Sequence, residues 1–541
     1  MSVLATSNRD NRMRLTRSYI ATLAGVALVA GCQDLAVTNP NRADRDRATK
    51  QATSVESFVS SSFRNWWPTA HDNYPSWALS TIANDVTSGF ADYGQLEVST
   101  EPRAGWNNSS VNARRNVNQL PWRDLYATIS TVNDALIATD AGLVIVDEAQ
   151  TARARAVAKF VQGISHGSLG MLYDQAFIVD EKLALDTVTA PAFHPYPAVL
   201  AASIAQLDEA AAIASTHSFT LPAASWLYMN MTSTEVARLA NSFSARILAS
   251  GARTRAEREA VDWNDVIRRI DAGIRTDYAP AAQSEVLEDN WKRLLARLRT
   301  VGRPSDYGRP SYWTLGPADS TDGFKNWAAK PVASRVAFQM RTRDRRIQGP
   351  LGPTDPGKYF VYNQNDIFAA ARGSYRYSHY AFTRWGTGTS WTSGPQPALT
   401  VTEMDLLKAE ALIRVGRAAE AVPLINKTRV ANGQLPPVTV EGPPNEAGCV
   451  PRKLNGDCGS LWDALRYEKR IEVYGVDGTL AFFDARGWQT MPENSIIHFP
   501  VPGSELETLR LPNYTFGGPG AQGSAPAPDP EHCPVARARC S

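Results

Sequence analysis

Five charged residues near the C-terminal end could support acid–base chemistry. Glu468, Arg470 and Glu472 stand two residues apart, and Asp484 and Arg486 follow at the same spacing. Carboxylates perform such chemistry when they face an open cleft. Here the charges alternate in sign on two neighbouring helical segments, with aromatic residues between them. We therefore interpret these five residues as structural ion pairs that stabilise a helix pair, and we expect no catalytic residue and no enzyme activity.

Two further motifs resemble catalytic or nucleotide-binding signatures but lack the required context. Residues 163–167 match G-x-S-x-G, yet a nucleophile elbow follows a strand, and residues 152–162 have a helical pattern. Residues 518–523 match G-x-G-x-x-G, with no βα unit around them. The seven His residues are scattered and form no H-E-x-x-H motif. We expect no metal site and no cofactor.

Aromatic residues beside amides are better candidates for function. Sugars stack their C–H faces on Trp and Tyr rings, and their hydroxyls bond to groups such as Asn. The candidate ligand-binding residues are Trp66, Trp67, Asn73, Trp77, Trp106, Asn107, Tyr312, Trp313, Tyr375, Tyr377, Trp385 and Trp391. The alternative for each ring is core filling, although aromatic residues on loops have fewer ways to be buried.

The N-terminal end has the pattern of an export signal. Arg14 and Arg17 precede an apolar run over 20–30, which is shorter than the roughly 20 residues that span a bilayer. Small residues at 29–31 lead directly to Cys32, so the segment resembles the lipobox of bacterial lipoproteins. That resemblance implies a lipid on Cys32 and a tether to a membrane outside the cytoplasm. The alternative is a secreted protein with a chance Cys.

Charge and composition exclude several classes of protein. The chain has 541 residues, of which 43% are hydrophobic and 20% charged, as in ordinary globular proteins. Residues 1–31 hold four Arg and one Asp, so their removal changes the net charge from +2 to −1. A nearly neutral protein lacks the basic face that nucleic acid requires, and we expect no nucleic-acid partner.

Four cysteines follow Cys32, and they allow three disulfide pairings. Disulfides persist in exported proteins. Cys449 with Cys458, and Cys533 with Cys540, are the local pairings, since each closes a short loop. A zinc site is disfavoured because the chain has no C-x-x-C motif and no His at ligand spacing.

Helical periodicity dominates the elements that must position these residues. Amphipathic patterns predict helices over 122–139, 149–179, 196–214, 232–250 and 255–273. The pattern returns over 401–431, where Gly416 separates two short apolar stripes, and again over 460–474. Two short helices with small residues at their crossing form a tetratricopeptide-like pair, which needs neighbours to bury its apolar face. The fold class is therefore mostly α, built from such helix pairs.

The remaining segments predict the domain organisation. Residues 1–31 are the signal peptide, 32–52 a flexible tether and 53–515 the folded domain, with helix pairs in about 120–275 and 400–490. Residues from about 303 to 395 interleave Gly, Pro and aromatic residues, which favours a lobe of loops and short strands. Residues 516–541 are rich in Gly, Pro and Ala, which favours a disordered tail.

Several C-terminal motifs, in order and behind a lipobox, resemble the SusD/RagB family of outer-membrane lipoproteins. They are Met404-Asp405-Leu406-Leu407-Lys408-Ala409-Glu410-Ala411, Ile425-Asn426-Lys427-Thr428-Arg429, Tyr467-Glu468-Lys469-Arg470-Ile471-Glu472, Phe483-Asp484-Ala485-Arg486-Gly487-Trp488, and Phe499-Pro500-Val501-Pro502. The motif-level match covers about 400–505, and the middle of the chain and the Cys449–Cys458 pair depart from the family pattern.

The resemblance implies a SusD-like α-helical superhelix that carries a ligand-binding lobe. It implies a lipid-anchored, surface-exposed protein of the outer membrane that binds a nutrient, an oligosaccharide or a peptide. It also implies a SusC-like TonB-dependent transporter as partner, to which the nutrient is delivered without catalysis. Two alternatives remain: an all-α surface enzyme that degrades polysaccharide, and a helical-repeat scaffold that binds only protein.

Overall fold

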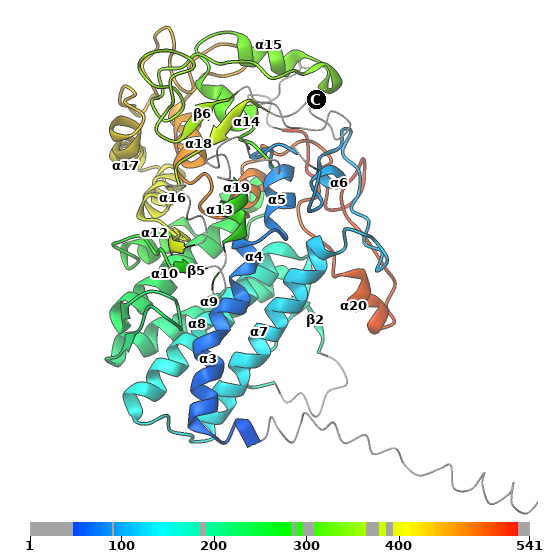
Figure 1. Ribbon diagram of the computed structural model, residues 1–541, viewed down its shortest axis with the longest axis vertical. Coiled ribbons are helices and arrows are strands. Elements are labelled where there is room, and N and C mark those ends of the chain that lie inside the picture. The colour runs from blue at the N-terminus through cyan, green and yellow to red at the C-terminus, as the bar shows by residue number, and fades with distance from the viewer. Residues whose placement is uncertain are drawn as a thin grey trace, which may run out of the picture. The chain divides into compact units, whose positions relative to one another are not determined.

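Long helices form most of the structure, a computed structural model that describes residues 47–88, 91–183, 191–283, 287, 289–295, 308–363, 378–385 and 393–528 (Figure 1). The longer helices are α3 (Ala52–Trp66), α7 (Asn116–Asp140), α8 (Glu148–Leu172), α9 (Tyr196–Thr216), α10 (Ser233–Ser250), α12 (Trp263–Asp271), α16 (Val401–Arg414), α17 (Ala418–Ala431), α18 (Leu461–Glu472) and α19 (Leu480–Gly487). The residues from Ala52 onward form one compact unit.

Shorter elements connect these helices. The short helices are α4 (Pro68–His71), α5 (Ser76–Ile82), α6 (Gln95–Ser99), α11 (Arg255–Glu259), α13 (Asn290–Leu295), α14 (Tyr312–Leu315), α15 (Gly323–Ala329), α20 (Gly503–Thr508), and the 3-10 turns η2 (Gly316–Ala318) and η3 (Val332–Ser334). The antiparallel two-stranded sheets are β1 (Gln175–Phe177) with β2 (Phe193–Pro195), β3 (Thr220–Leu221) with β4 (Met231–Thr232), β5 (Ala281–Gln283) with β8 (Ser393–Pro395), and β6 (Phe360–Tyr362) with β7 (Tyr380–Phe382).

Successive helices pack side by side in a continuous stack. Helix α8 packs against α7 and α9, α9 against α10, α10 against α12, and α12 against α16. Helix α16 then pairs with α17, and α18 packs against both. Helix α9 is long and apolar enough to cross a membrane by length and composition, and one face of it packs against α8 and α10 while only 33% of its apolar window is buried. The predicted helix pairs over 120–275 and over 401–431 are present.

Two predicted elements differ in the structure. The helix expected over 255–273 is broken into α11 and α12, because Asp262 caps a new helix by accepting a bond from the amide of Asp265. The two helical segments that carry the charged motif, α18 and α19, were expected to form a helix pair, but they do not pack as one. Helix α18 packs on α16 and α17, whereas α19 packs on α5, α10 and α11.

Close packing of neighbouring helices explains the glycines of the G-x-S-x-G motif. A Cβ on Gly163 would lie 2.7 Å from Cγ of Leu207, and one on Gly167 would lie 2.6 Å from Cδ1 of Ile247. The motif therefore lies where α8 crosses α9 and α10. Ser165 is buried and its hydroxyl donates to the carbonyl of Val161 within the same helix, so the motif forms no nucleophile elbow.

The described parts of the aromatic-rich segment, 308–363 and 378–385, contain loops and short strands and contribute to a second hydrophobic core. Short helices α14 and α15 and the β6–β7 hairpin pack their rings together with α18. Tyr312, Tyr380 and Phe360 are buried there. Short strands were expected, whereas the extent of this burial was not.

The start of the predicted disordered tail is part of the folded unit. Phe516 and Ala525 are buried, and Ile496 bridges to Ser524. Composition favoured disorder over 516–528, but glycines at positive φ, such as Gly517 and Gly523, let this segment turn against the domain. Residues 529–541, with Cys533 and Cys540, lie outside the described residues, as do the signal segment and Cys32.

Candidate functional site

The charged C-terminal motif surrounds a buried arginine from outside the motif. The guanidinium of Arg346 lies 2.6 Å from Asp344, 2.5 Å from Glu468 and 2.9 Å from Glu472, and all four side chains are fully buried. Tyr359 donates to Glu472. Burial raises the pKa of Glu468. Carboxylates enclosed in this way link α18 to the second core, and their complete burial leaves no exposed surface for a substrate.

Among the described residues, the partners of Arg470, Asp484 and Arg486 lie outside the five-residue motif, so the motif does not pair internally as expected. Asp484 lies 2.8 Å from Lys469 and 3.1 Å from Arg258, which links α19 to α18 and α11. Arg486 donates to backbone carbonyls, among them that of Ser250 at the end of α10. Arg470 likewise donates to a carbonyl, that of Ala83. Arg470 also lies 3.9 Å from Asp85, so it does form an ion pair, though with a partner outside the motif. Arg486 instead bridges segments by donating to carbonyl groups.

The first candidate aromatic residues belong to the core. Trp66, Trp67, Trp77 and Trp106 are 4%, 1%, 0% and 5% exposed. Trp66 continues the buried stripe of Val55, Val59 and Phe63 along α3 and donates to the hydroxyl of Ser168. Trp67 stacks on His71, with ring centres 3.7 Å apart. Trp77 packs edge-on against Trp291, and Trp106 packs edge-on against Phe499.

The two candidate amides do not accompany these rings at a surface. Asn73 is half-buried in the turn between α4 and α5. Asn107 is exposed, and its Oδ1 accepts from the amide of Ser109, as in an Asx turn. The grouping of these amides with Trp66, Trp67, Trp77 and Trp106 as a sugar site is therefore wrong.

The third group of candidates is divided between the core and the surface. Tyr312 is buried, and its hydroxyl donates to the carbonyl of Phe338. Trp385 is half-buried, lies under the guanidinium of Arg384 and donates to the carbonyl of Tyr474. Trp313 is half-buried and lines a cavity. Tyr375, Tyr377 and Trp391 lie outside the described residues.

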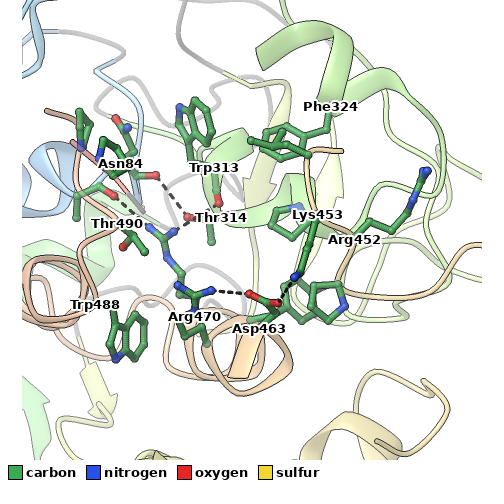
Figure 2. A pocket seen from close by; sticks show the side chains of 18 of the residues that line it. Asn84, Trp313, Thr314, Phe324, Arg452, Lys453, Asp463, Arg470, Trp488 and Thr490 are labelled. Carbon is green, nitrogen blue, oxygen red and sulfur yellow. Dashed lines mark hydrogen bonds and ion pairs between the residues drawn. The ribbon is translucent and has the colours of Figure 1, made fainter. Parts of the chain in front are cut away.

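A cavity of about 680 Å³ lies beside Trp313 (Figure 2). Its walls come from several places along the chain: Ala83 and Asn84 after α5, Glu101, the segment 313–335 with α14 and α15, the loop over 451–454, helix α18, the segment 488–493 after α19, and Pro528. A volume of this size fits a ligand of a few sugar rings, since small-molecule sites span about 300–1,000 Å³. The second core thus positions a pocket whose parts are more than 170 residues apart in sequence.

Aromatic rings supply apolar surface to this cavity. Trp313 and Phe324 lie together on one wall, with ring centres 5.6 Å apart, and Trp488 comes from another segment (Figure 2). Trp313 also packs edge-on against Trp327, 5.8 Å away, which holds the ring in place. A fixed, half-exposed indole with polar groups around it suits stacking against an apolar sugar face.

The predicted disulfide between Cys449 and Cys458 is present, with the Cα atoms 5.8 Å apart. It closes the loop that carries Pro451–Leu454 to the cavity wall. The amide of Arg452 donates to the carbonyl of Pro317, and its guanidinium donates to the carbonyl of Thr321. The loop is therefore anchored to the aromatic segment as well as closed by the disulfide.

Sequence reasoning missed most residues of this cavity. Phe324, Arg335, Lys453 and Trp488 all line it, yet none stands near Trp313 in the sequence except Phe324. One signal was available. The Cys pair encloses the basic residues Arg452 and Lys453, and a short closed loop with that composition marks a positioned surface.

Comparisons with known proteins identify the fold. No protein-family model matches the chain, and no curated protein is similar enough to match. A SusD homolog from Parabacteroides distasonis is similar over 80% of this chain and 84% of its own, with 12% identity and a TM-score of 0.53. A SusD superfamily protein from Bacteroides vulgatus is similar over 85% and 97%, with 13% identity and a TM-score of 0.50.

This chain has the SusD-like fold. The architecture that the C-terminal motifs implied is thereby confirmed, namely a mostly helical protein with a stack of helix pairs. At these identities the likeness concerns the fold alone. The SusD-like fold here carries its cavity on the face formed by the second core and the disulfide loop.

Proposed function

We propose that this protein is a nutrient-binding lipoprotein of the SusD/RagB family that holds an oligosaccharide in the cavity beside Trp313. The observation that carries the proposal is a SusD-like fold in which a fixed indole lines a cavity of about 680 Å³. The lipobox pattern at Cys32 supports an anchor in the outer membrane, with the folded domain at the cell surface. A peptide nutrient in the same cavity is the alternative ligand.

One carboxylate of the cavity is held by structural hydrogen bonds, which leaves Glu101 and Glu493 as the only pair of lining carboxylates for a glycosidase among the described residues. Glu101, Asp463 and Glu493 line the cavity. Asp463 is committed to structure, because it accepts bonds from the amide and hydroxyl of Ser460 in the capping box of α18 and from Arg466. A glycosidase needs two carboxyl groups free to act as acid and as base or nucleophile on opposite sides of the bond.

Two matched tryptophan variants test the ligand site. Trp313→Ala removes a ring that lines the cavity, and Trp385→Ala removes a half-buried ring of the same segment that does not. Stacking is worth about 0.5–1.5 kcal/mol beyond burial, so Trp313→Ala should weaken oligosaccharide binding about two- to tenfold. Isothermal titration should show unchanged affinity for Trp385→Ala. Equal affinity of the two variants would exclude the cavity as the binding site.

The proposed partner is a SusC-like TonB-dependent transporter, to which the captured nutrient is delivered. Purification of the lipidated protein from its own membrane, in mild detergent, tests this pairing. We expect a large β-barrel protein to co-purify with the wild type and with Trp313→Ala alike, because the cavity and not the partner surface is changed. Consistent recovery of the lipidated protein alone would contradict the partnership.

A further inference from the structure

Basic side chains outnumber acidic ones around the cavity. Its basic lining residues are Lys330, Arg335, Arg452, Lys453, Arg466 and Arg470. The acidic residues in the same lining are Glu101, Asp463 and Glu493. The lining therefore has a formal balance of +3, although the whole chain has a net charge of only +2 over 541 residues. The positive charge is concentrated where a ligand would lie.

Two of the three acidic residues already have cations beside them. Asp463 lies 3.8 Å from Lys453 (Figure 2). It also accepts from Arg466 at 2.5 Å, so one carboxylate faces two cations. Glu101 lies 4.0 Å from Arg103, which is not part of the lining. Two carboxylates outside the lining also face its cations: Asp322 lies 3.7 Å from Arg452, and Asp85 lies 3.9 Å from Arg470. Counted together with Arg103, they leave a formal balance of +2 around the cavity, so a ligand there still meets a net positive potential.

Four of the lining cations come from two segments that are far apart in the sequence, 330–335 and 452–453. Arg452 and Lys453 are carried by the loop that the Cys449–Cys458 disulfide closes. Arg335 follows η3, where its guanidinium lies over the rings of Trp313 and Trp327, at 5.8 and 4.9 Å. Aromatic surface and fixed positive charge thus occur together at Trp313. This pairing suits a sugar ring whose edge carries an anionic group.

We infer that the cavity selects an anionic saccharide, one that carries carboxylate or sulfate groups, by means of the basic disulfide loop and the Arg335 segment. This inference rests on the proposed function and narrows its ligand class. Arg and Lys bind carboxylate and sulfate through charge-assisted hydrogen bonds, which are about twice as strong as neutral ones. The partly enclosed cavity reduces screening of those bonds.

Affinity electrophoresis of the full chain through gels that contain defined polysaccharides tests the inference. The uronate probes are polygalacturonate and alginate, and the sulfate probe is a sulfated galactan. The neutral probes are methyl-esterified polygalacturonate, which keeps the same backbone without its charge, and unsulfated galactan. We expect retardation by uronate or by sulfated polymer, at least about tenfold stronger than by the matched neutral polymer, and reduced by 0.5 M salt.

A variant of the loop and a control variant locate the effect. Lys453→Met removes a cation of the cavity, and Lys325→Met removes an exposed one on α15 outside the lining. Lys453→Met should weaken retardation by the charged polymer about tenfold, and Lys325→Met should leave it unchanged. Circular dichroism confirms that both variants fold.

The outcomes separate this inference from the proposed function. Equal retardation by charged and matched neutral polymers, with loss of both in Trp313→Ala, would overturn the anionic ligand and leave the nutrient-binding site intact. If Lys453→Met and Lys325→Met weakened retardation by the charged polymer equally, the binding would come from general surface charge, and the inference would be overturned as well. Retardation by none of the polymers would contradict both the ligand class and the proposed saccharide ligand.

Discussion

Arg346 offers a direct test of the structural role assigned to the charged motif. Its guanidinium contacts Asp344, Glu468 and Glu472, and two further arginines reach the same group: Arg429 lies 3.2 Å from Glu468, and Arg384 lies 3.4 Å from Glu472. Three carboxylates thus face three guanidinium groups in the second core. Arg346→Met keeps most of the side-chain volume and leaves one negative charge unmatched.

The burial of Arg346 and its partners determines how much stability Arg346→Met is expected to lose. Removal of one partner from a buried ion pair destabilises a protein by about 3–5 kcal/mol, because the remaining charge has no compensation. Arg346, Asp344, Glu468 and Glu472 are all fully buried, so the free energy of unfolding of Arg346→Met should fall by about that amount at pH 8. Urea denaturation followed by tryptophan fluorescence measures it.

The pH dependence provides a second readout. Burial already raises the pKa of Glu468, and loss of Arg346 should raise it further. A carboxyl group with a raised folded-state pKa binds its proton more tightly in the folded protein. Protonation of Glu468 therefore stabilises the folded state at low pH. This stabilisation is lost as the pH rises from the pKa of the unfolded state, about 4.3, through the raised pKa of the folded state. The free energy of unfolding that Arg346→Met loses relative to the wild type should thus be smaller at pH 5 than at pH 8.

Arg343→Met is the matched control. Arg343 lies 2.5 Å from Glu446, but the two side chains are 51% and 45% exposed. An exposed pair of this kind contributes about 0–1 kcal/mol, so the control should unfold almost as the wild type does. If Arg346→Met were as stable as Arg343→Met at both pH values, the interpretation of the charged motif as a structural network would be refuted.

Two further predictions concern the disulfide loop and the helix stack. The double variant Cys449→Ser, Cys458→Ser opens a short loop, and the chain-entropy relation predicts a loss of up to about 2.7 kcal/mol in the free energy of unfolding. The variant should have a lower melting temperature and bind its ligand more weakly. Unchanged binding would show that the loop needs no disulfide to hold the cavity wall. Gly163→Ala should destabilise the protein by about 1–3 kcal/mol, because the new Cβ would lie 2.7 Å from Leu207. This loss should exceed the gain from the higher helix propensity of Ala. A rise in melting temperature would show that the crossing of α8 and α9 has room for the added methyl group.

Local patterns were sufficient for most of the helices. The apolar stripes of α7, α8, α9, α10, α16 and α17 recur at the helical period, so their positions followed from the sequence. The short separation of Cys449 from Cys458 likewise predicted the disulfide correctly. Periodicity alone predicted one helix over 255–273, whereas the structure has two, α11 and α12. The difference arises because Asp262 between them caps the start of a new helix.

The candidate site was less predictable, because an aromatic side chain looks the same in the sequence whether it is buried or exposed. Trp66, Trp77 and Trp313 have the same chemistry, and only the packing of α3, α5 and α14 against their neighbours decides that the first two fill the core while the third lines a cavity. The partners of Glu468 were equally hidden, since Arg346 stands 122 residues away.

The sequence by itself determined the local elements of this protein, namely its amphipathic helices and its closed Cys loop, each of which depends on residues only a few positions apart. Only the tertiary structure decided which rings and charges meet. The cavity is assembled from segments distant along the chain, and burial and charge compensation are properties of the neighbours in space rather than of the neighbours in sequence.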